Sequence, residues 1–366
     1  MNNKFRSISV VAVMTALVSV FSVWNILKTP EEYSLSERRA LAQIPELNAE
    51  SIVSGDFMDE FETYAADQFP LRDSIRSIKS FTELNIFRKS DVNGLYMQDG
   101  HIVKNEKLLD TEMLDYAGEK FRYIYDTFIA NSNAKVYLSI VPDKSYYLSD
   151  GRPALDYEKL TEEMQKRTDY MTYIDISHLL EADDYYKTDS HWKQECIQDT
   201  AQELAAAMGA DAGSKYHENT LDIPFYGVYY GQLGLSCQPD TIKYLTNDTL
   251  DSCYVTSYGT GSPKESVIYN MEKAEGKDPY EMFLSGTEPF ITIENPAADT
   301  DRELVIFRDS YGSSLAPLLI EGYSKITLID IRYMQSSFLG SLIEFDEQDV
   351  LFLYSASLLN SSTALR

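Results

Sequence analysis

Segments of strand length alternate with segments of helix length along much of this 366-residue chain, and this alternation constrains the fold more than any other feature. Helix-like segments lie at 109–131 and 156–169. The apolar, strand-like segments are, in chain order, 134–142, 170–176, 303–307, 324–331 and 349–354. Such alternation predicts parallel strands joined by crossover helices. We therefore expect an α/β domain whose late strands complete a sheet that begins in the first half of the chain.

Three stretches depart from the alternation. Apolar residues recur at helical spacing in residues 29–90, which predicts a helical lead-in. Asn-Gly and Asp-Gly turn signals then flank a short apolar run near residue 95 and predict a hairpin. Residues 210–300 gain Gly, Pro, Thr and Asp, so we expect an irregular or β-rich insertion there, within a domain that spans 91–366.

An uncharged run, "ISVVAVMTALVSVFSVWNIL", fills residues 8–27. As a helix it would be about 30 Å long, at roughly 1.5 Å per residue, which is enough to cross a bilayer. Lys4 and Arg6 precede the run, so the positive-inside rule predicts that the rest of the protein lies outside the cytoplasm. We interpret residues 1–28 as a membrane anchor, and a cleaved signal peptide is the alternative.

The charge and the cysteines limit the partners and the covalent framework. A net charge of −26 opposes binding to phosphate backbones, so nucleic acid is not an expected partner. The odd number of cysteines in a chain of this size does not indicate a disulfide framework. Cys237 and Cys253 could still pair across a short loop, and we expect Cys196 to be a free thiol.

Two segments carry residues suited to acyl transfer. In "YKTDSHWKQE", Asp189 lies two residues before His191, and a carboxylate at that spacing can orient an imidazole that acts as a general base. In "ELVIFRDSYGSSLAPLL", an apolar strand runs into Ser310 and then into a helix, a turn that exposes a hydroxyl beside free backbone N–H groups. Taken alone, Ser310 could equally be a helix cap.

Other polar residues admit several interpretations. Asp189 and His191, alone or together with His178, could bind a metal, although no third ligand lies at a spacing typical of metal sites. Lys144 and Arg332 follow predicted strands, where each could hold an acyl or sugar oxygen or form a surface salt bridge. Trp192 is expected to pack beneath the site as one of its walls.

Several stretches together resemble the DHHW proteins, relatives of the alginate O-acetyltransferases within the SGNH hydrolase superfamily. They are "SERRALAQIPE", "SGDFMDEFETYAADQFPLRDSIRSIK", "NGLYMQDG", "IVPDK", "TDSHWKQE", "YYGQLGLSCQPD", "FRDSYGSSLAPLL" and "IDIRY". The resemblance implies an SGNH-like parallel sheet flanked by helices, with Ser310 as nucleophile, His191 as general base and Asp189 as its orienting acid. Two positions depart from the family pattern: Ser190 replaces a histidine, and Arg308 replaces the glycine of Gly-Asp-Ser.

The resemblance also implies a function: an extracytoplasmic O-acetyltransferase that moves an acetyl group through an acyl-serine onto hydroxyls of a secreted or cell-wall polysaccharide. A multispanning membrane acyltransferase would supply the acetyl group, and no metal or organic cofactor is needed. A carbohydrate esterase, in which water replaces the sugar hydroxyl, is one alternative. A non-catalytic polysaccharide-binding or scaffold protein of an export complex is the other.

Overall fold

The computed structural model describes residues 3–34, 36–106, 108–148, 152, 154–213, 215–235, 237–259 and 262–366. The chain forms two compact units. The first contains Met1–Asn93 and Tyr230–Ser236, and the second contains Gly94–Tyr229 and Cys237–Arg366. The short segment 230–236 therefore packs with the lead-in, although it follows the first part of the large unit in sequence.

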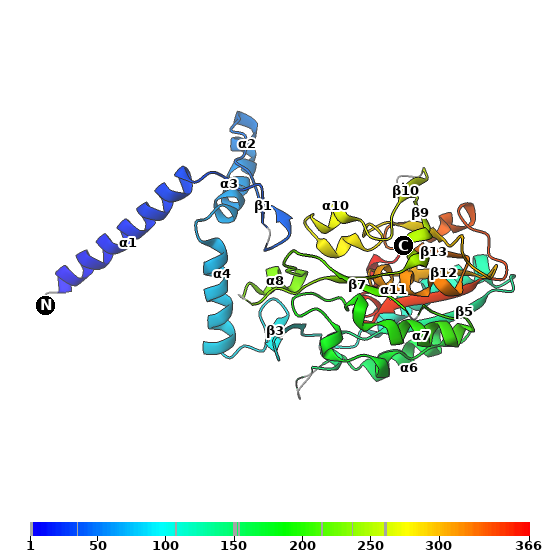
Figure 1. Cartoon of the computed structure of the whole chain (residues 1–366). Helices are drawn as coiled ribbons and strands as arrows, with labels where there is room; N and C mark the ends of the chain where they lie inside the picture. Colours follow the sequence, from blue (N-terminus) through cyan, green and yellow to red (C-terminus); the bar gives the residue numbers. More distant parts are fainter. Residues whose placement is uncertain are drawn as a thin grey trace. The chain divides into compact units, whose positions relative to one another are not determined.

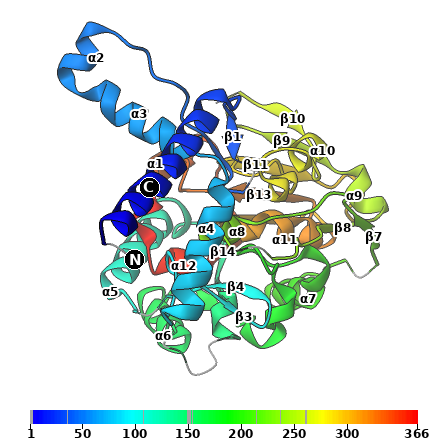
Figure 2. The same ribbon diagram turned by 90° about the vertical axis from the view of Figure 1, so that its left-hand side faces the viewer.

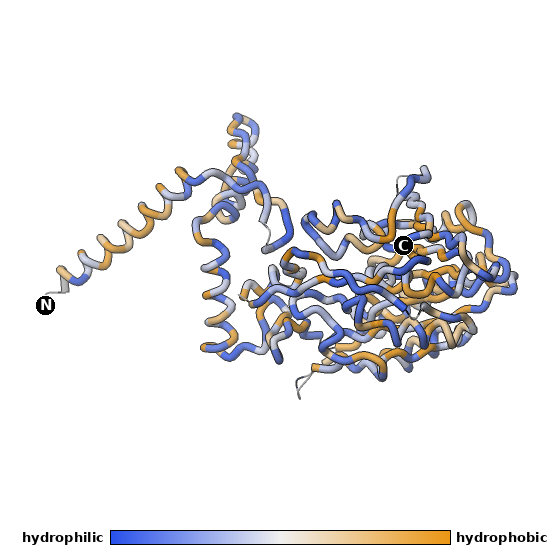
Figure 3. The backbone as a smooth tube through the Cα atoms, in the orientation of Figure 1, coloured by the Kyte–Doolittle hydropathy of each residue, from blue (hydrophilic) through white to orange (hydrophobic). Residues whose placement is uncertain are grey.

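The first unit begins with the long apolar helix α1, Asn3–Leu27. Its stretch Phe5–Leu27 is long and apolar enough to cross a membrane, and none of its most apolar window is buried against the protein. In Figure 3 this helix carries mostly hydrophobic residues along its length. The chain thus has an N-terminal helix with the composition of a membrane span.

The predicted helical lead-in follows. Its elements are β1 (Tyr33–Ser34), β2 (Arg39–Ala40), α2 (Ala49–Ser54), α3 (Asp56–Asp67), α4 (Arg72–Phe81) and the π-helical turn η1 (Thr82–Ile86). A network of ion pairs joins them. Arg39 binds Asp67 at 2.5 Å, and both Arg72 and Arg76 bind Glu37 at 2.7 Å. The charged residues of "SERRAL" are therefore structural: they connect the two short strands to α3 and α4.

The second unit holds the remaining elements. Its helices are α5 (Thr111–Ile124), α6 (Tyr157–Arg167), α7 (Gln198–Met208), α8 (Val228–Leu233, whose end belongs to the first unit), α9 (Asp248–Ser252), α10 (Met271–Ala274), α11 (Tyr311–Leu319) and α12 (Ala356–Leu359). Its strands are β3 (Leu95–Gln98), β4 (His101–Lys104), β5 (Lys135–Val141), β6 (Thr172–Tyr173), β7 (His217–Thr220), β8 (Lys243–Thr246), β9 (Tyr254–Ser257), β10 (Lys264–Ser266), β11 (Phe290–Glu294), β12 (Glu303–Arg308), β13 (Lys325–Ile329) and β14 (Asp349–Ser355).

Within the described residues, an eight-stranded sheet has the order β10-β9-β11-β13-β12-β14-β5-β6. Figure 1 labels β5, β9, β10, β12 and β13 of this sheet. The run from β13 to β6 is parallel, which confirms that the late strands complete a sheet begun by β5. Strands β11, β9 and β10 of the insertion extend the sheet antiparallel. The expected hairpin is β3–β4, and β6 is shorter than the predicted segment 170–176.

Helices cover both faces of the sheet (Figure 2). Alternate residues of β12 point to opposite faces, as a strand requires. Leu304 and Ile306 pack in the core that contains α7 and α11, whereas Val305 and Phe307 pack in the core that contains α5 and α6. A strand buried on both faces reads as a continuous apolar run, which explains "ELVIF". Ligand sites of such folds lie beyond the carboxyl ends of the parallel strands.

Candidate active site

Ser310 lies at the carboxyl end of β12, between the strand and the first turn of α11. The turn is held by its neighbour Asp309, whose carboxylate accepts the N–H of Tyr311 at 3.1 Å and the N–H of Ser355 at 2.8 Å. Ser355 ends β14, so Asp309 joins the turn that carries Ser310 to the adjacent strand. This contact fixes the hydroxyl of Ser310 at the edge of the sheet where parallel α/β proteins bind ligands.

His191 and Asp189 meet Ser310 although 119 residues separate His191 from Ser310 in sequence. The Nε2 atom of His191 lies 2.6 Å from Ser310 Oγ, and its Nδ1 atom lies 2.5 Å from Asp189 Oδ1. Both residues precede the short turn η6 (Gln194–Cys196) and lie on an irregular loop, where side chains two apart can share a face. The arrangement joins hydroxyl, imidazole and carboxylate in one hydrogen-bonded relay.

The carboxylate of Asp189 accepts hydrogen bonds from two main-chain N–H groups. The residue is 1% exposed, and its carboxylate accepts the N–H of His191 at 3.1 Å and the N–H of Val228 at 2.8 Å. Gly227 makes the second contact possible, because a Cβ atom there would lie 2.2 Å from Asp189 Cβ. Hydrogen bonds from N–H groups stabilise a buried carboxylate as an anion, the form that orients an imidazole and stabilises its cation.

Lys144 supports the loop from beneath. It lies on the turn η3 (Lys144–Tyr146) after β5, is 2% exposed, and donates to the carbonyls of Tyr186, Lys187 and Asp189 at 2.8, 3.2 and 2.7 Å. Burial lowers the pKa of Lys144 to about 7. The lysine is therefore neither a surface salt bridge nor a side chain that faces a substrate. Its ammonium holds the main chain that carries Asp189 and His191.

Aromatic rings enclose the imidazole. Trp192 is fully buried, as expected of a wall, and its Nε1 donates to Ser314 Oγ at 2.9 Å. Tyr280, on the turn η7 (Pro279–Met282), stacks on His191 with ring centroids 3.9 Å apart and 12° between the planes. The Tyr280 hydroxyl lies 2.8 Å from the same Ser314 oxygen. Tyr280 could not be predicted as a site residue, because it belongs to the insertion, whose sequence lacks periodicity.

Arg308 and Arg332 flank the buried carboxylate of Asp330, beside the turn that carries Ser310. Arg332 binds Asp330 through two N–H groups, at 2.9 and 2.6 Å, after β13. Arg308 is 1% exposed, lies 3.7 Å from the same carboxylate and donates to Ser313 Oγ at 3.0 Å. A Cβ atom at position 312 would lie only 2.7 Å from the Cβ atom of Arg308, so the turn needs a glycine at position 312 to hold the arginine side chain. The turn therefore accommodates arginine at the family's glycine position.

The remaining sequence candidates lie apart from this relay. His178 has its Nδ1 atom 3.9 Å from Asp175, and no group of three or more His, Cys, Asp or Glu able to hold a metal is present among the described residues. Cys196, Cys237 and Cys253 are free thiols, so the possible pairing of Cys237 with Cys253 is not formed. The Ser190 carbonyl, at the family's histidine position, accepts the hydroxyl of Tyr311 at 2.7 Å.

A family model described as "DHHW protein" matches residues 123–329, more than half of the chain. The chain belongs to the DHHW family. The family region includes the loop with Asp189 and His191 as well as the turn with Ser310. No curated protein sequence matches the chain.

Solved structures share the fold. A DHHW family protein from Eubacterium siraeum aligns at 22% identity and a TM-score of 0.61, over 75% of this chain and 94% of that chain. Bacillus cereus PatB1 aligns at 19% identity and a TM-score of 0.59, over 72% of this chain and 96% of that one; a second PatB1 structure, with a sulfonyl adduct, gives a TM-score of 0.58. The O-acetyltransferase domain of Pseudomonas putida AlgJ aligns more loosely, with 14% identity and a TM-score of 0.46, over 73% of this chain and 92% of that chain. The fold of this DHHW protein is SGNH-like α/β.

Proposed function

We propose that this protein is an extracytoplasmic O-acetyltransferase that transfers an acetyl group, through an acyl-serine, to hydroxyls of a secreted or cell-wall polysaccharide. The observation that carries the proposal is the relay in which His191 lies 2.6 Å from Ser310 Oγ and 2.5 Å from Asp189 Oδ1. Such spacing lets an imidazole take a proton from a hydroxyl as it attacks a carbonyl carbon. A helix cap has no need of a histidine and a buried carboxylate.

In the first half-reaction, Ser310 Oγ attacks the acetyl carbonyl carbon of the donor ester and its proton passes to His191 Nε2. Asp189 stabilises the resulting imidazolium through the Nδ1–H bond. When the tetrahedral intermediate collapses, the bond to the donor oxygen breaks and His191 returns the proton to that oxygen. The acetyl group is then esterified to Ser310.

The oxyanion of the intermediate needs a donor close to Ser310. The N–H groups of Tyr311 and Gly312 are bonded to the carboxylate and the carbonyl of Asp309. The amide of Ser310 itself has no acceptor among the described residues, so it is the donor that the proposal uses. A fixed main-chain donor of this kind is worth several kcal/mol when it is aimed at the developing charge, by analogy with removal costs of about 2.7 to 4 kcal/mol.

In the second half-reaction, His191 takes the proton of a sugar hydroxyl, whose oxygen attacks the acetyl carbon of acyl-Ser310. Collapse breaks the bond to Ser310 Oγ, which regains a proton from His191, and the acetylated sugar leaves. Water could enter in place of the sugar, which would make the protein an esterase. The same relay serves both reactions, so the distinction depends on how the acceptor is bound.

Further observations support the proposed location outside the cytoplasm and the proposed serine mechanism. The helix α1 would anchor the protein, and Lys4 and Arg6 before it favour export of the large unit under the positive-inside rule. PatB1, which shares the fold, carries a sulfonyl adduct in one structure, and sulfonyl reagents as a class modify activated serine hydroxyls. The acetyl donor in this proposal is supplied by a multispanning membrane acyltransferase.

Replacing Ser310 with alanine tests the proposal in cells that make the polymer. We expect acetylation of the extracellular polysaccharide to be lost, while Ser341→Ala, an exposed serine outside the relay, leaves it unchanged. Unchanged acetylation in Ser310→Ala cells would show a non-catalytic role instead. Incubating the purified protein with an acetyl ester and oligosaccharides separates the two enzymes, because acetate release with no acetylated sugar identifies an esterase.

A further inference from the structure

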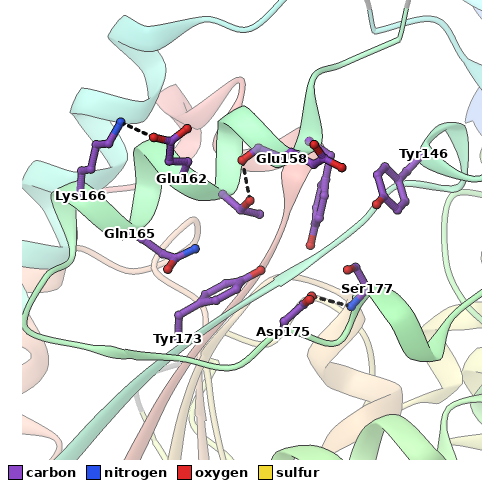
Figure 4. A pocket seen from close by; sticks show the side chains of 10 residues that line it. Tyr146, Glu158, Glu162, Gln165, Lys166, Tyr173, Asp175 and Ser177 are labelled. Atoms are coloured by element: carbon purple, nitrogen blue, oxygen red, sulfur yellow. Dashed lines mark hydrogen bonds and ion pairs between the residues drawn. The ribbon is translucent and has the colours of Figure 1, made fainter.

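A cavity of about 610 Å³ lies at the edge strand β6 of the sheet, outside the relay (Figure 4). One side is formed by α6, and the other by the segment that runs from β6 toward Ser177. Figure 4 shows Tyr173 at one end and Tyr146 at the other, with Glu162 directed toward Lys166 and Asp175 directed toward Ser177. The cavity is open to solvent, so a section of a longer chain can enter it and continue beyond it.

Tyrosine rings give the cavity a fixed aromatic wall. Tyr146 and Tyr157 have ring centroids 4.8 Å apart, and the Tyr157 hydroxyl donates to the carbonyl of Ile140 at 2.7 Å. Tyr157 is 5% exposed, whereas Tyr146 is 37% exposed, so a buried ring supports one that meets solvent. An aromatic ring that is held in place and still exposed offers a face for the C–H groups of a sugar, and its hydroxyl offers a hydrogen bond.

Carboxylates supply acceptors around the rings. Glu158 and Glu162 come from α6, and Asp175 comes from the opposite side. One oxygen of Asp175 accepts the N–H of Ser177 at 2.9 Å, and Lys166 binds Glu162 at 2.9 Å. An ionised carboxylate can only accept hydrogen bonds, and each sugar hydroxyl can donate one to it. The carboxylates outweigh the ammonium of Lys166, so the cavity repels an anionic sugar such as a uronate.

The cavity is connected to the relay through one short turn. Lys144 starts that turn and holds the carbonyl of Asp189 at 2.7 Å, while Tyr146 ends it at the cavity. Two residues of chain separate their Cα atoms by at most about 7.6 Å. Tyr146 therefore belongs to the same short turn as the lysine that holds the loop of the relay.

We propose that this cavity is a subsite for a neutral sugar chain, which it holds a few units away from the hydroxyl that receives the acetyl group. The inference rests on the proposed function in one respect, since it takes the acceptor to be a polysaccharide. It adds a substrate class: uncharged hexose or N-acetylhexosamine units, with polyuronates excluded. It also places acceptor recognition on a part of the sheet that the acyl-serine step does not use.

Binding to the full-length Ser310→Ala protein in detergent tests the subsite without any turnover. The probes are pentamers of β-linked glucose, of N-acetylglucosamine and of galactose, together with a galacturonate pentamer, and calorimetry gives each Kd. We expect at least one neutral pentamer to bind and the galacturonate pentamer not to bind. Tyr146→Ala and Tyr173→Ala should each raise the neutral pentamer's Kd by about threefold to tenfold, the range of an aromatic contact.

Matched controls separate the cavity from the general surface. Tyr123 is 44% exposed on α5 and does not line the cavity, so Tyr123→Ala should leave the Kd unchanged. Glu162→Gln should relax the rejection of galacturonate, whereas Glu119→Gln, an exposed glutamate of α5, should not. Equal Kd values for wild type, Tyr146→Ala and Tyr173→Ala, binding of galacturonate as tight as that of the neutral pentamers, or no binding by any neutral pentamer would each overturn the proposal.

Turnover measurements keep this inference separate from the acyl-serine mechanism. In proteins with Ser310 intact, Tyr146→Ala and Tyr173→Ala should raise the KM for the neutral acceptor and leave the rate of acetyl ester cleavage without acceptor unchanged. Loss of ester cleavage in these variants would contradict a subsite role. Failure of Ser310→Ala to abolish cleavage would overturn the mechanism and leave the pentamer binding result intact.

Discussion

Asp67 in the first unit and Asp189 in the second are 8% and 1% exposed, yet their carboxylates accept from different donors. Asp67 binds the guanidinium of Arg39 at 2.5 and 2.8 Å and the N–H of Ala42 at 2.9 Å. Asp189 binds an imidazole and two main-chain N–H groups. A guanidinium stays charged at any physiological pH, whereas an imidazole gains and loses its proton near neutrality. The same residue type is thus a structural anchor in one unit and an acid that can serve proton transfer in the other.

The surroundings of these carboxylates differ as well. The buried apolar residues of the first unit are few among those described, namely Leu41, Val92 and Leu233, so ion pairs carry much of its cohesion. The second unit has two large apolar cores, and Asp189 and Lys144 are buried charged residues of its proposed site. The comparison indicates that charge in the first unit takes the place of a core, while the second unit buries these charges in addition to its cores.

The largest expected effect comes from exchanging the two acids for asparagine in turn. Asp189→Asn should lower kcat/KM for acetyl ester cleavage by about 10³- to 10⁴-fold, because the amide no longer orients the imidazole or stabilises its cation. Asp67→Asn should leave that rate within about twofold of wild type. Steady-state kinetics of both variants check this, and a large loss in Asp67→Asn or a small one in Asp189→Asn would break the contrast.

Lys144→Met should have a smaller effect, a drop of about 10- to 100-fold in kcat with little change in KM, because a displaced loop misplaces His191. Burial lowers the pKa of Lys144 to about 7, and the neutral amine has one N–H fewer for the carbonyls. The wild-type rate should therefore decline as the pH rises above about 7, and this decline should be absent in Lys144→Met. Lys135→Met, an exposed lysine of β5, is the control. A decline that persists in Lys144→Met would assign it to another group.

The smallest effect concerns stability in acid. The hydrogen bond from Arg39 lowers the pKa of Asp67 to about 2, against an ordinary value of 3.8. A carboxyl whose pKa is lower in the folded state stabilises the fold above pH 3.8, and that stabilisation is lost as the pH falls toward 2. Asp67→Asn should cost about 1 to 2 kcal/mol at neutral pH, between the values for exposed and buried pairs, and should flatten this acid dependence.

Chemical denaturation of the full chain at pH 6, 4 and 3 measures this dependence. The exposed Asp59 of α3 supplies the matched control, and Asp59→Asn should follow the wild-type curve. If Asp67→Asn also follows that curve, the ion pair contributes nothing to folding stability and the first unit depends on other contacts.

The parts of the proposed site that depend on residues adjacent in the chain could be predicted from the sequence. The apolar strand before Ser310 and the acid-x-histidine spacing at 189–191 mark groups whose chemistry is set by neighbours in the chain or by resemblance to a family. The prediction that Lys144 follows a strand is correct, but its hydrogen-bond partners could not be predicted. Lys144 is buried by a loop that lies 42 to 45 residues later in the sequence, and the carbonyls of that loop accept its hydrogen bonds. The contact of Tyr280 with His191 could not be predicted, because Tyr280 belongs to an insertion whose sequence has no helical or strand periodicity.

The fold likewise has parts that could be predicted from local sequence and parts that depend on distant residues. The parallel strands could be predicted because each is an apolar run bounded by helical segments. The antiparallel extension by β9, β10 and β11 could be anticipated only as a β-rich insertion, because strands with one exposed face, such as Tyr254–Ser257, mix polar and apolar residues. The register of β11 depends on pairing with β13, which lies further along the chain.

The position of β14 in the sheet has a consequence for how the protein is made. β14 is the last strand in sequence, and it lies between β12 and β5, where it pairs with both. Until residues 349–355 have left the ribosome, the growing chain holds two half-sheets with unpaired edges, and such edges recruit other strands. Contacts of this long range also close slowly. A chain that stops before residue 349 therefore lacks the strand that joins the two half-sheets, and the edges of both stay unpaired.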